Sequence, residues 1–228
     1  MSIAILGVGK LGEALLSGLI RSGQAPGDLI AAEKHPERAV EIAARYGVAT
    51  ADPVDAAAAA DVLLLAVKPQ DMQALLVDIA PVVRPETLGV SMAAGITMGL
   101  LEGALPSGTA VVRVMTNTPV FVDEAMSALS GGAHATPAQV QLVEDLLSHL
   151  GKVVRVPEAQ MDAVTALSGS GPAYFFFLVE AMIDAGILLG LPRAVAAELI
   201  VQTAVGSAKM LRESGEHPVL LREAVTSP

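Results

Sequence analysis

The chain has 228 residues, of which 53% are hydrophobic and 3% aromatic, and its formal net charge at pH 7 is −10. Its length allows one large domain or two smaller ones, and its 14 basic residues form no cluster, which argues against nucleic-acid binding. The absence of cysteine excludes disulfides, thiolate metal sites and a cysteine nucleophile, and the histidines are too scattered for a metal centre (His35, His134, His149 and His217).

Strand-like and helix-like segments alternate through the first two thirds of the chain. Strands are predicted at residues 2–6, 29–32, 48–50, 62–67, 88–91, 111–115, 126–129 and 152–156. Helices are predicted at residues 11–20, 37–46, 54–60, 98–105 and 137–150. This alternation predicts an α/β fold with a doubly wound, Rossmann-type parallel sheet and right-handed crossovers. Glycines and charges interrupt residues 3–20, which are therefore predicted to be a strand and a helix, not a signal or transmembrane segment, in a cytoplasmic protein.

The strand signal disappears after Pro157, and helices are predicted at residues 160–167, 173–189 and 193–213, with another beginning at Val219. We therefore expect two domains, a dinucleotide-binding domain at 1–157 and an all-helical domain at 158–228. Residues 174–189 are apolar on nearly every side, and Glu180 and Asp184 are the only charges there. Such a helix must be buried, and about 70 residues cannot bury it well alone, so we expect a partner subunit.

A glycine-rich turn follows the first strand and opens the first helix. It has the pattern G-x-G-x-x-G in Gly7-Val8-Gly9-Lys10-Leu11-Gly12. In that context Gly7 permits the tight turn, Gly9 lets a pyrophosphate approach the backbone, and Gly12 lets the helix pack closely on the strand. The free N–H groups of the helix N-terminus would hold the phosphates. The alternative is an ordinary strand-to-helix turn.

Ligands of an open parallel sheet bind outside the carboxyl ends of its strands. Small side chains there, at Ala93-Ala94-Gly95, would let a flat ring pass close to the backbone, and Asn117 follows a further strand. Lys68 ends the most apolar strand, as either a solvated lysine or a cofactor contact. After the second strand, Glu33 favours NAD, whereas Lys34, His35 and the nearby Arg38 favour the 2′-phosphate of NADP.

A second unusual segment, Asp162–Tyr174, contains two Ser-Gly pairs and a proline before an apolar helix. Its backbone N–H groups and hydroxyls suit a carboxylate, although a linker between helices is the alternative. No histidine lies where a Ser-His-Asp arrangement would need it, so a nucleophilic serine is not expected.

Together these segments resemble the pyrroline-5-carboxylate reductases of proline biosynthesis, from Ile3 to Pro228. The Asp162–Tyr174 string is the most specific part of the resemblance. The other matching segments are Gly7–Gly12, Ala66–Pro69, Ala93–Thr97, Met115–Pro119, Ala208–Met210 and Thr226–Pro228.

The resemblance implies an oxidoreductase that transfers a hydride from NADPH to the C=N carbon of 1-pyrroline-5-carboxylate, giving L-proline. NADP(H) would be preferred and NAD(H) possible, without a metal, because a protonated cyclic imine is already an electrophile. The implied assembly is a homodimer or higher homo-oligomer formed by the helical domain, with neither nucleic acid nor membrane as a partner. Cofactor contacts are expected from Gly7, Val8, Gly9, Lys10, Leu11, Gly12, Lys34, His35, Ala66, Val67, Lys68, Pro69, Ala93, Ala94, Gly95 and Asn117. Substrate contacts are expected from Glu158, Ser168, Gly169, Ser170, Gly171 and Ser227.

Members of this family continue past the match to Ser227-Pro228 into Gly-Gly-x-Thr and further helices. There, backbone amides bind the substrate carboxylate and the threonine handles the proton. We therefore expect this sequence to be truncated at its C-terminus and to lack a certain catalytic residue, to bind NADP(H), and to turn over poorly. Ala224 stands where some members have an asparagine near the cofactor. The rival hypotheses are a related β-hydroxyacid or ketopantoate-type dehydrogenase, and a catalytically inactive, dimerising nucleotide-binding protein.

Overall fold

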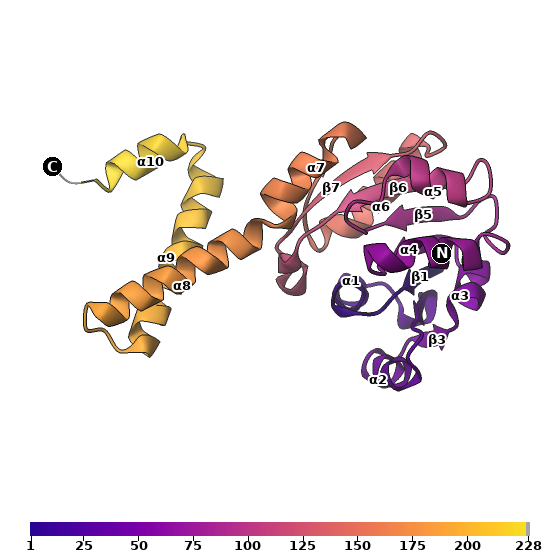
Figure 1. The fold of residues 1–228 in the computed structure, drawn as a ribbon, viewed down its shortest axis with the longest axis horizontal. Coiled ribbons are helices and arrows are strands. Elements are labelled where there is room, and N and C mark those ends of the chain that lie inside the picture. The colour runs from indigo at the N-terminus through magenta and orange to yellow at the C-terminus, as the bar shows by residue number, and fades with distance from the viewer. Residues whose placement is uncertain (227–228) are drawn as a thin grey trace. The chain divides into compact units, whose positions relative to one another are not determined.

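The computed structural model describes residues 1–226, and these form two compact units that divide after Gly171. Within the first unit, eight strands make one sheet in the order β3-β2-β1-β4-β5-β6-β7-β8 (Figure 1). The strands are β1 (Ile3–Leu6), β2 (Leu29–Ala32), β3 (Ala49–Ala51), β4 (Val62–Leu65), β5 (Leu88–Ser91), β6 (Ala110–Met115), β7 (Ala125–Gly131) and β8 (Gly151–Arg155). The α/β Rossmann-type fold predicted from the alternation is confirmed.

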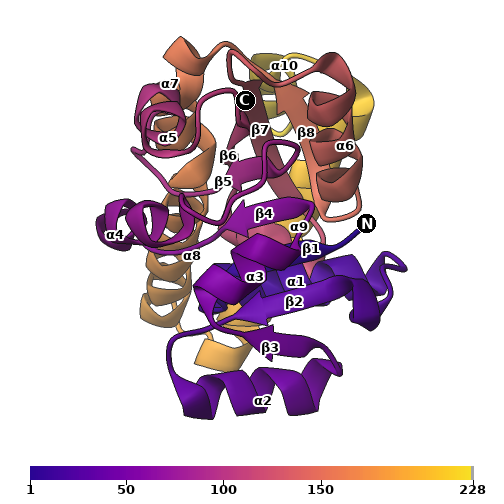
Figure 2. The same ribbon diagram turned by 90° about the vertical axis from the view of Figure 1, so that its right-hand side faces the viewer.

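Helices cover both faces of the sheet, and Figure 2 shows α4 and α5 on one side of the strands and α6 on the other. One core lies under the helices α1 (Lys10–Arg21), α2 (Pro36–Tyr46) and α6 (Pro137–Ser148). The other core lies under α3 (Pro53–Ala59), α4 (Pro69–Ile79) and α5 (Met98–Ala104). The strands at the centre are therefore buried on both sides, which explains their continuous apolar sequences.

Local sequence signals place several helix ends. Pro36 is the first residue of α2, and Gly47 ends that helix in a left-handed conformation with φ 68°. Thr136 and Gln139 form a reciprocal capping box at the start of α6. These ends need no tertiary contact to be specified.

The sequence had predicted a wholly parallel sheet, and this prediction is wrong for one strand pair. β7 runs antiparallel to β6, and β8 runs parallel to β7. The segment between β6 and β7 holds only a 3-10 turn, Thr118–Val122. A parallel crossover needs a dozen or more residues, so this short connection returns the chain in the opposite direction.

The sequence analysis also missed α4. Pro69 occupies its first turn, and the buried residues Met72, Leu75, Leu76 and Ile79 repeat at helical spacing. That spacing is enough to predict a helix, although the sequence analysis recorded only the apolar strand before it.

The expected glycine-rich break after residue 167 is helical. A 3-10 turn (Glu158–Gln160) leads into α7 (Met161–Val164), a π-helical turn (Thr165–Gly169) and α8 (Gly171–Leu188). Ser170 N–H donates to the Thr165 carbonyl at 2.8 Å, which is the wide π-type hydrogen bond. The Ser-Gly pairs therefore lie on a helix, not in an open loop.

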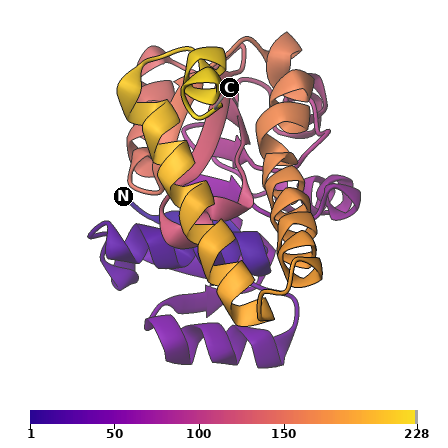
Figure 3. The ribbon, with the colours of Figure 1, turned by 90° about the vertical axis from the view of Figure 1, so that its left-hand side faces the viewer.

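The second unit is helical, as predicted. Figure 3 shows that a tight turn connects the C-terminus of α8 to the N-terminus of α9 (Arg193–Ser214). The last helix, α10 (Pro218–Ala224), follows α9. Leu191 N–H donates to the Gly186 carbonyl at 3.0 Å, and Gly190 takes the positive φ of 95° that the turn requires. Large apolar side chains of α8 are exposed in the single chain, including Phe175, Phe176 and Phe177 at 67%, 67% and 73%.

Two helical stretches, Glu158–Leu188 and Arg193–Ser214, are long and apolar enough to cross a membrane. Length and composition are the only basis for this, and core helices of water-soluble proteins meet the same criteria. The stretches are therefore weak evidence for a membrane.

Candidate cofactor and substrate site

The glycine-rich turn has the geometry that its sequence predicts. Gly7 leaves β1 with φ 96°, and its N–H donates to the Ala32 carbonyl at the end of β2, at 2.9 Å. Gly9 is the N-cap of α1 and no side chain caps that end. A Cβ on Gly12 would overlap the Gly7 carbonyl oxygen, so the helix can approach the turn only with glycine there.

A cavity of about 340 Å³ opens beside this turn, at the carboxyl ends of β1, β2 and β4. A Cβ on Gly9 would meet no atom within 4 Å, so its backbone faces open space. The uncapped N–H groups of α1 provide donors for an anion there. Predicted residues that line the cavity are Gly7, Gly9, Lys34, His35, Ala66, Val67 and Lys68.

The lining also includes Pro53, Asp71 and Leu75, which the sequence analysis did not select. Asp71 and Leu75 belong to α4, so finding that helix would have placed them. Val8, Lys10, Leu11 and Gly12 lie in the turn and first turn of α1, and Pro69 begins α4, but these five do not line the cavity.

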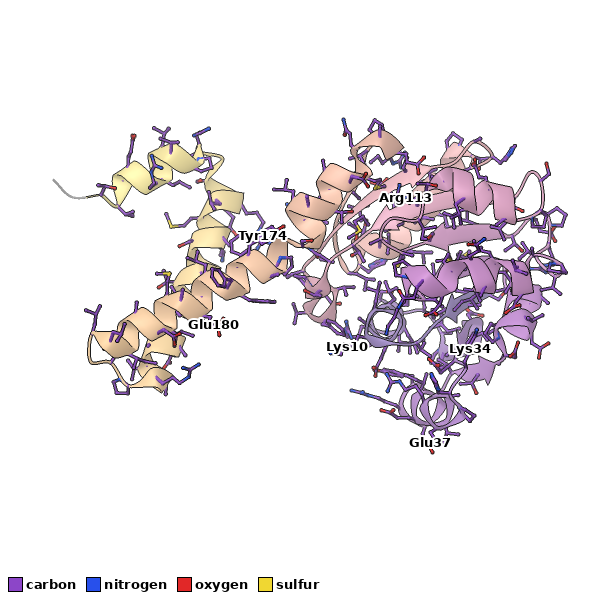
Figure 4. All side chains as sticks on the ribbon, viewed as in Figure 1. Lys10, Lys34, Glu37, Arg113, Tyr174 and Glu180 are labelled. Atoms are coloured by element: carbon purple, nitrogen blue, oxygen red, sulfur yellow. The ribbon has the colours of Figure 1, made fainter. Side chains whose placement is uncertain are left out.

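The charges after β2 are divided between two roles. Lys34 and His35 line the cavity, and Glu33 accepts a hydrogen bond from His35 N–H at 3.1 Å (Lys34 is labelled in Figure 4). Arg38 does not line it, because its guanidinium is paired with Glu13 and Glu41. Glu33, Lys34 and His35 therefore all lie at the cavity, and Arg38 does not.

Glu13 on α1 joins that helix to α2. Its carboxylate is paired with Arg38 and accepts hydrogen bonds from Arg45 Nη1 at 2.9 Å and Tyr46 Oη at 2.8 Å. Burial by itself would raise the pKa of Glu13. The hydrogen bonds from Tyr46 and Arg38 and the charges of Arg38 and Arg45 outweigh burial and hold the pKa below its usual 4.5.

This carboxylate should make the first unit sensitive to acid. Because the folded-state pKa of Glu13 is depressed, its stabilisation is complete above about pH 4.5 and is lost as the pH falls through the folded-state pKa. We expect the urea midpoint to fall between pH 7 and about pH 3.5, and to fall less in Glu13→Gln. An identical pH dependence in Glu13→Gln would contradict this assignment.

The segments after β5 and β6 supply further candidates at the same edge of the sheet. Ala93, Ala94 and Gly95 follow β5, and Gly95 takes φ 76° before α5 begins. Asn117 follows β6. None of these four lines the 340 Å³ cavity. Their cofactor contacts stay predictions.

Glu158 lies in the first unit, where two hydrogen bonds fix its carboxylate. Its Oε1 accepts hydrogen bonds from the Met98 N–H at the start of α5, at 2.6 Å, and from Arg113 Nη1 at 3.0 Å. Arg113 lies in β6 with its side chain 7% exposed (Figure 4). Sequence reasoning missed Arg113, although a single charge in an otherwise apolar strand is a usable signal.

Of the other substrate candidates, Ser168 contacts Asn117. Gly169, Ser170 and Gly171 complete the turn into α8. Ser227 lies outside the described residues. No group of three or more metal-ligating side chains occurs in the part of the chain that the structure describes.

Comparisons with known proteins cover both units. The family model "Pyrroline-5-carboxylate reductase dimerisation" matches residues 158–228, and "NADP oxidoreductase coenzyme F420-dependent" matches residues 2–95. Pyrroline-5-carboxylate reductase of Mycobacterium tuberculosis is 46% identical over 220 residues, covering 94% of this chain and 75% of that protein.

Solved structures agree with this relation. A pyrroline-5-carboxylate reductase from Coxiella burnetii superposes with TM-score 0.92 at 33% identity, over 100% of this chain and 85% of the other. Plasmodium falciparum pyrroline carboxylate reductase with NADP bound superposes with TM-score 0.91 at 27% identity, over the same shares. The sequence identity, its coverage and the match of the helical unit show that this chain belongs to the pyrroline-5-carboxylate reductase family.

Proposed function

We propose that this protein is an NADPH-dependent oxidoreductase that reduces the C=N bond of 1-pyrroline-5-carboxylate to give L-proline. The observation that carries the proposal is family membership over both units, together with an open glycine-turn cavity in the first. When bound, NADPH supplies the hydride that the imine carbon accepts, and a proton on the ring nitrogen completes the amine. The proposed setting is proline biosynthesis in the cytoplasm.

The chain's own residues would bind and orient the two reactants. The Gly9 backbone and the N-terminus of α1 fit a pyrophosphate, and Lys34 and His35 fit a 2′-phosphate at the carboxyl end of β2. Ala93, Ala94 and Gly95 offer a backbone without bulky side chains for the nicotinamide. Glu158, Ser168, Gly169, Ser170 and Gly171 form the substrate side, so that positioning, not a metal, supplies most of the acceleration.

We retain domains at 1–157 and 158–228 as part of the proposal. The dimerisation family model begins at residue 158, whereas the division into compact units falls after Gly171. The residues between them belong to the helical family match but pack with the first unit.

The two rival functions are less favoured. A β-hydroxyacid or ketopantoate-type dehydrogenase would share the glycine turn but not the dimerisation match over 158–228. An inactive nucleotide-binding protein predicts cofactor binding without turnover. Steady-state oxidation of NADPH and NADH with 1-pyrroline-5-carboxylate decides among the three. Slow imine-dependent oxidation, faster with NADPH than with NADH, is expected of residues 1–228, and a version extended through the family's Gly-Gly-x-Thr segment should turn over faster. Cofactor binding without any turnover in the extended version would contradict the proposal.

Lys34→Ala should weaken NADPH binding and leave NADH binding nearly unchanged. The loss of a charge-assisted contact to the 2′-phosphate costs about 1.5–3 kcal/mol, which is roughly 10- to 150-fold in Kd. Titration of both cofactors into wild type, Lys34→Ala and the control Lys152→Ala on β8 measures this. An unchanged ratio of the two Kd values in Lys34→Ala would mean that Lys34 does not read the phosphate.

We further propose that α8 and its neighbours pair with a second copy of the chain, not with a membrane. The exposed phenylalanines need a cover, and the matched family model is a dimerisation domain. Phe177→Asp should shift the protein toward monomer in sedimentation. Val40→Asp, at a similarly exposed apolar position (69%) on α2, should not. Wild-type protein that sediments as a monomer, or floats with lipid vesicles, would contradict this pairing.

A further inference from the structure

Asn117 and Ser168 lie 51 residues apart in the sequence and meet at a helix irregularity that the proposed function leaves unexplained. The residue four positions after Ser168 is Pro172, which has no N–H. In a regular α-helix that N–H would donate to the Ser168 carbonyl, and the proline ring would crowd the same carbonyl. The π-helical turn at Thr165–Gly169 widens the backbone at this place.

Asn117 supplies the missing donor. Its Nδ2 lies 3.2 Å from the Ser168 carbonyl oxygen and 3.4 Å from the Ser168 hydroxyl oxygen. Its Oδ1 accepts a hydrogen bond from the Met126 N–H of β7 at 2.9 Å. Since the Met126 amide can only donate, the orientation of the Asn117 amide is fixed, with its NH₂ group toward Ser168.

The π-helical turn also lies against the end of β6. A Cβ on Gly169 would meet the terminal methyl group of Met115, the last residue of β6, which is the flexible end of that side chain. The end of β6 and the π-helical turn therefore pack directly against each other. Asn117 follows at the carboxyl edge of the sheet, where ligands of this fold class bind.

We propose that Asn117 is a positioning residue for the substrate and not a cofactor ligand. It satisfies the Ser168 carbonyl and donates to the Ser168 hydroxyl oxygen, so the hydroxyl hydrogen is left to donate to the substrate carboxylate. This rests on the proposed function for the identity of the substrate. It replaces the cofactor contact that the sequence analysis expected of Asn117.

Asn117→Asp is the sharpest test, because it keeps the oxygen that accepts from Met126 and removes the NH₂ group that faces Ser168. We expect the KM for 1-pyrroline-5-carboxylate, and the Kd for L-proline measured by calorimetry with NADP⁺ present, to rise about tenfold or more. The Kd for NADPH should stay within about twofold. Gln139→Glu makes the same amide-to-carboxylate change in the capping box of α6 and should alter none of these constants.

Ser168→Ala supplies a second variant if Asn117→Asp does not fold. It should raise the imine KM and proline Kd by a similar factor at unchanged NADPH affinity. Because Asn117 acts through Ser168, the double variant should not exceed the larger single effect by more than about twofold.

Three outcomes would overturn the proposal. They are a tenfold loss of NADPH affinity in Asn117→Asp with unchanged imine KM, a silent Ser168→Ala, and effects that multiply in the double variant. Wild-type protein that binds proline without turning over the imine would contradict the proposed function alone. Wild-type protein that binds neither L-proline nor the imine would contradict both the role of Asn117 and the proposed function.

Discussion

Gly9→Val should fold normally and lose most of its affinity for NADPH. A Cβ at Gly9 meets no protein atom within 4 Å, and the residue has an ordinary φ of −67°, so the chain itself tolerates a side chain. The same space must hold the pyrophosphate if the cavity binds a dinucleotide. We expect the Kd to rise at least about 100-fold, equivalent to roughly 2.7 kcal/mol.

The neighbouring glycine should behave differently. A Cβ at Gly12 would overlap the Gly7 carbonyl oxygen, and backbone cannot move aside as a flexible side chain can. Gly12→Ala should therefore lower the free energy of unfolding by about 3 kcal/mol as well as cofactor affinity. Gly27→Val, at another glycine with open space around it, is the control for both measurements. Unchanged NADPH affinity in folded Gly9→Val protein would remove the dinucleotide interpretation.

Glu158→Leu should destabilise the first unit by about 3 kcal/mol, since it leaves the Arg113 guanidinium buried without its carboxylate. The reverse change should cost less, about 1–2 kcal/mol in Arg113→Leu. The Glu158 side chain is 36% exposed and keeps the hydrogen bond from Met98 N–H, so water and backbone still solvate its charge.

Urea unfolding measures this asymmetry. Glu41→Ala removes an exposed partner of Arg38, with the Glu41 side chain 56% exposed, and should cost less than about 0.5 kcal/mol. The double variant Glu158→Leu with Arg113→Leu should recover part of the loss, because no charge is then left unpaired. Equal costs for the two single variants would mean that the burial of Arg113 does not govern the pair.

Several parts of the fold and site were predictable because their signals are local. The strands at 29–32 and 88–91 coincide with β2 and β5, and α2 begins at Pro36 and ends before the left-handed Gly47. The turn Gly7–Gly12 also needs only its neighbours, since φ 96° at Gly7 and the lack of a Cβ at Gly12 are properties of those residues. The position of Lys34, His35 and Lys68 beside this turn was also predictable, because the carboxyl ends of adjacent parallel strands lie at one edge of a sheet.

Other features of the fold could not be predicted from local sequence signals. Ser-Gly pairs normally indicate a break, yet Ser168–Gly171 continues a helix through a π-helical turn. The direction of β7 was also undetermined, because an apolar strand has the same composition whether it runs parallel or antiparallel to its neighbour.

The sequence by itself determined the fold class, the glycine-rich turn and the apolar helix at residues 174–189, because each depends on adjacent residues or on their periodicity. Only the tertiary structure decided which charged and polar groups meet. Arg38 pairs with Glu13 across 25 residues, Arg113 with Glu158 across 45, and Asn117 with Ser168 across 51. Such pairs depend on which strand ends and helix starts the sheet brings within about 3 Å, and no pattern of neighbours along the chain encodes that distance.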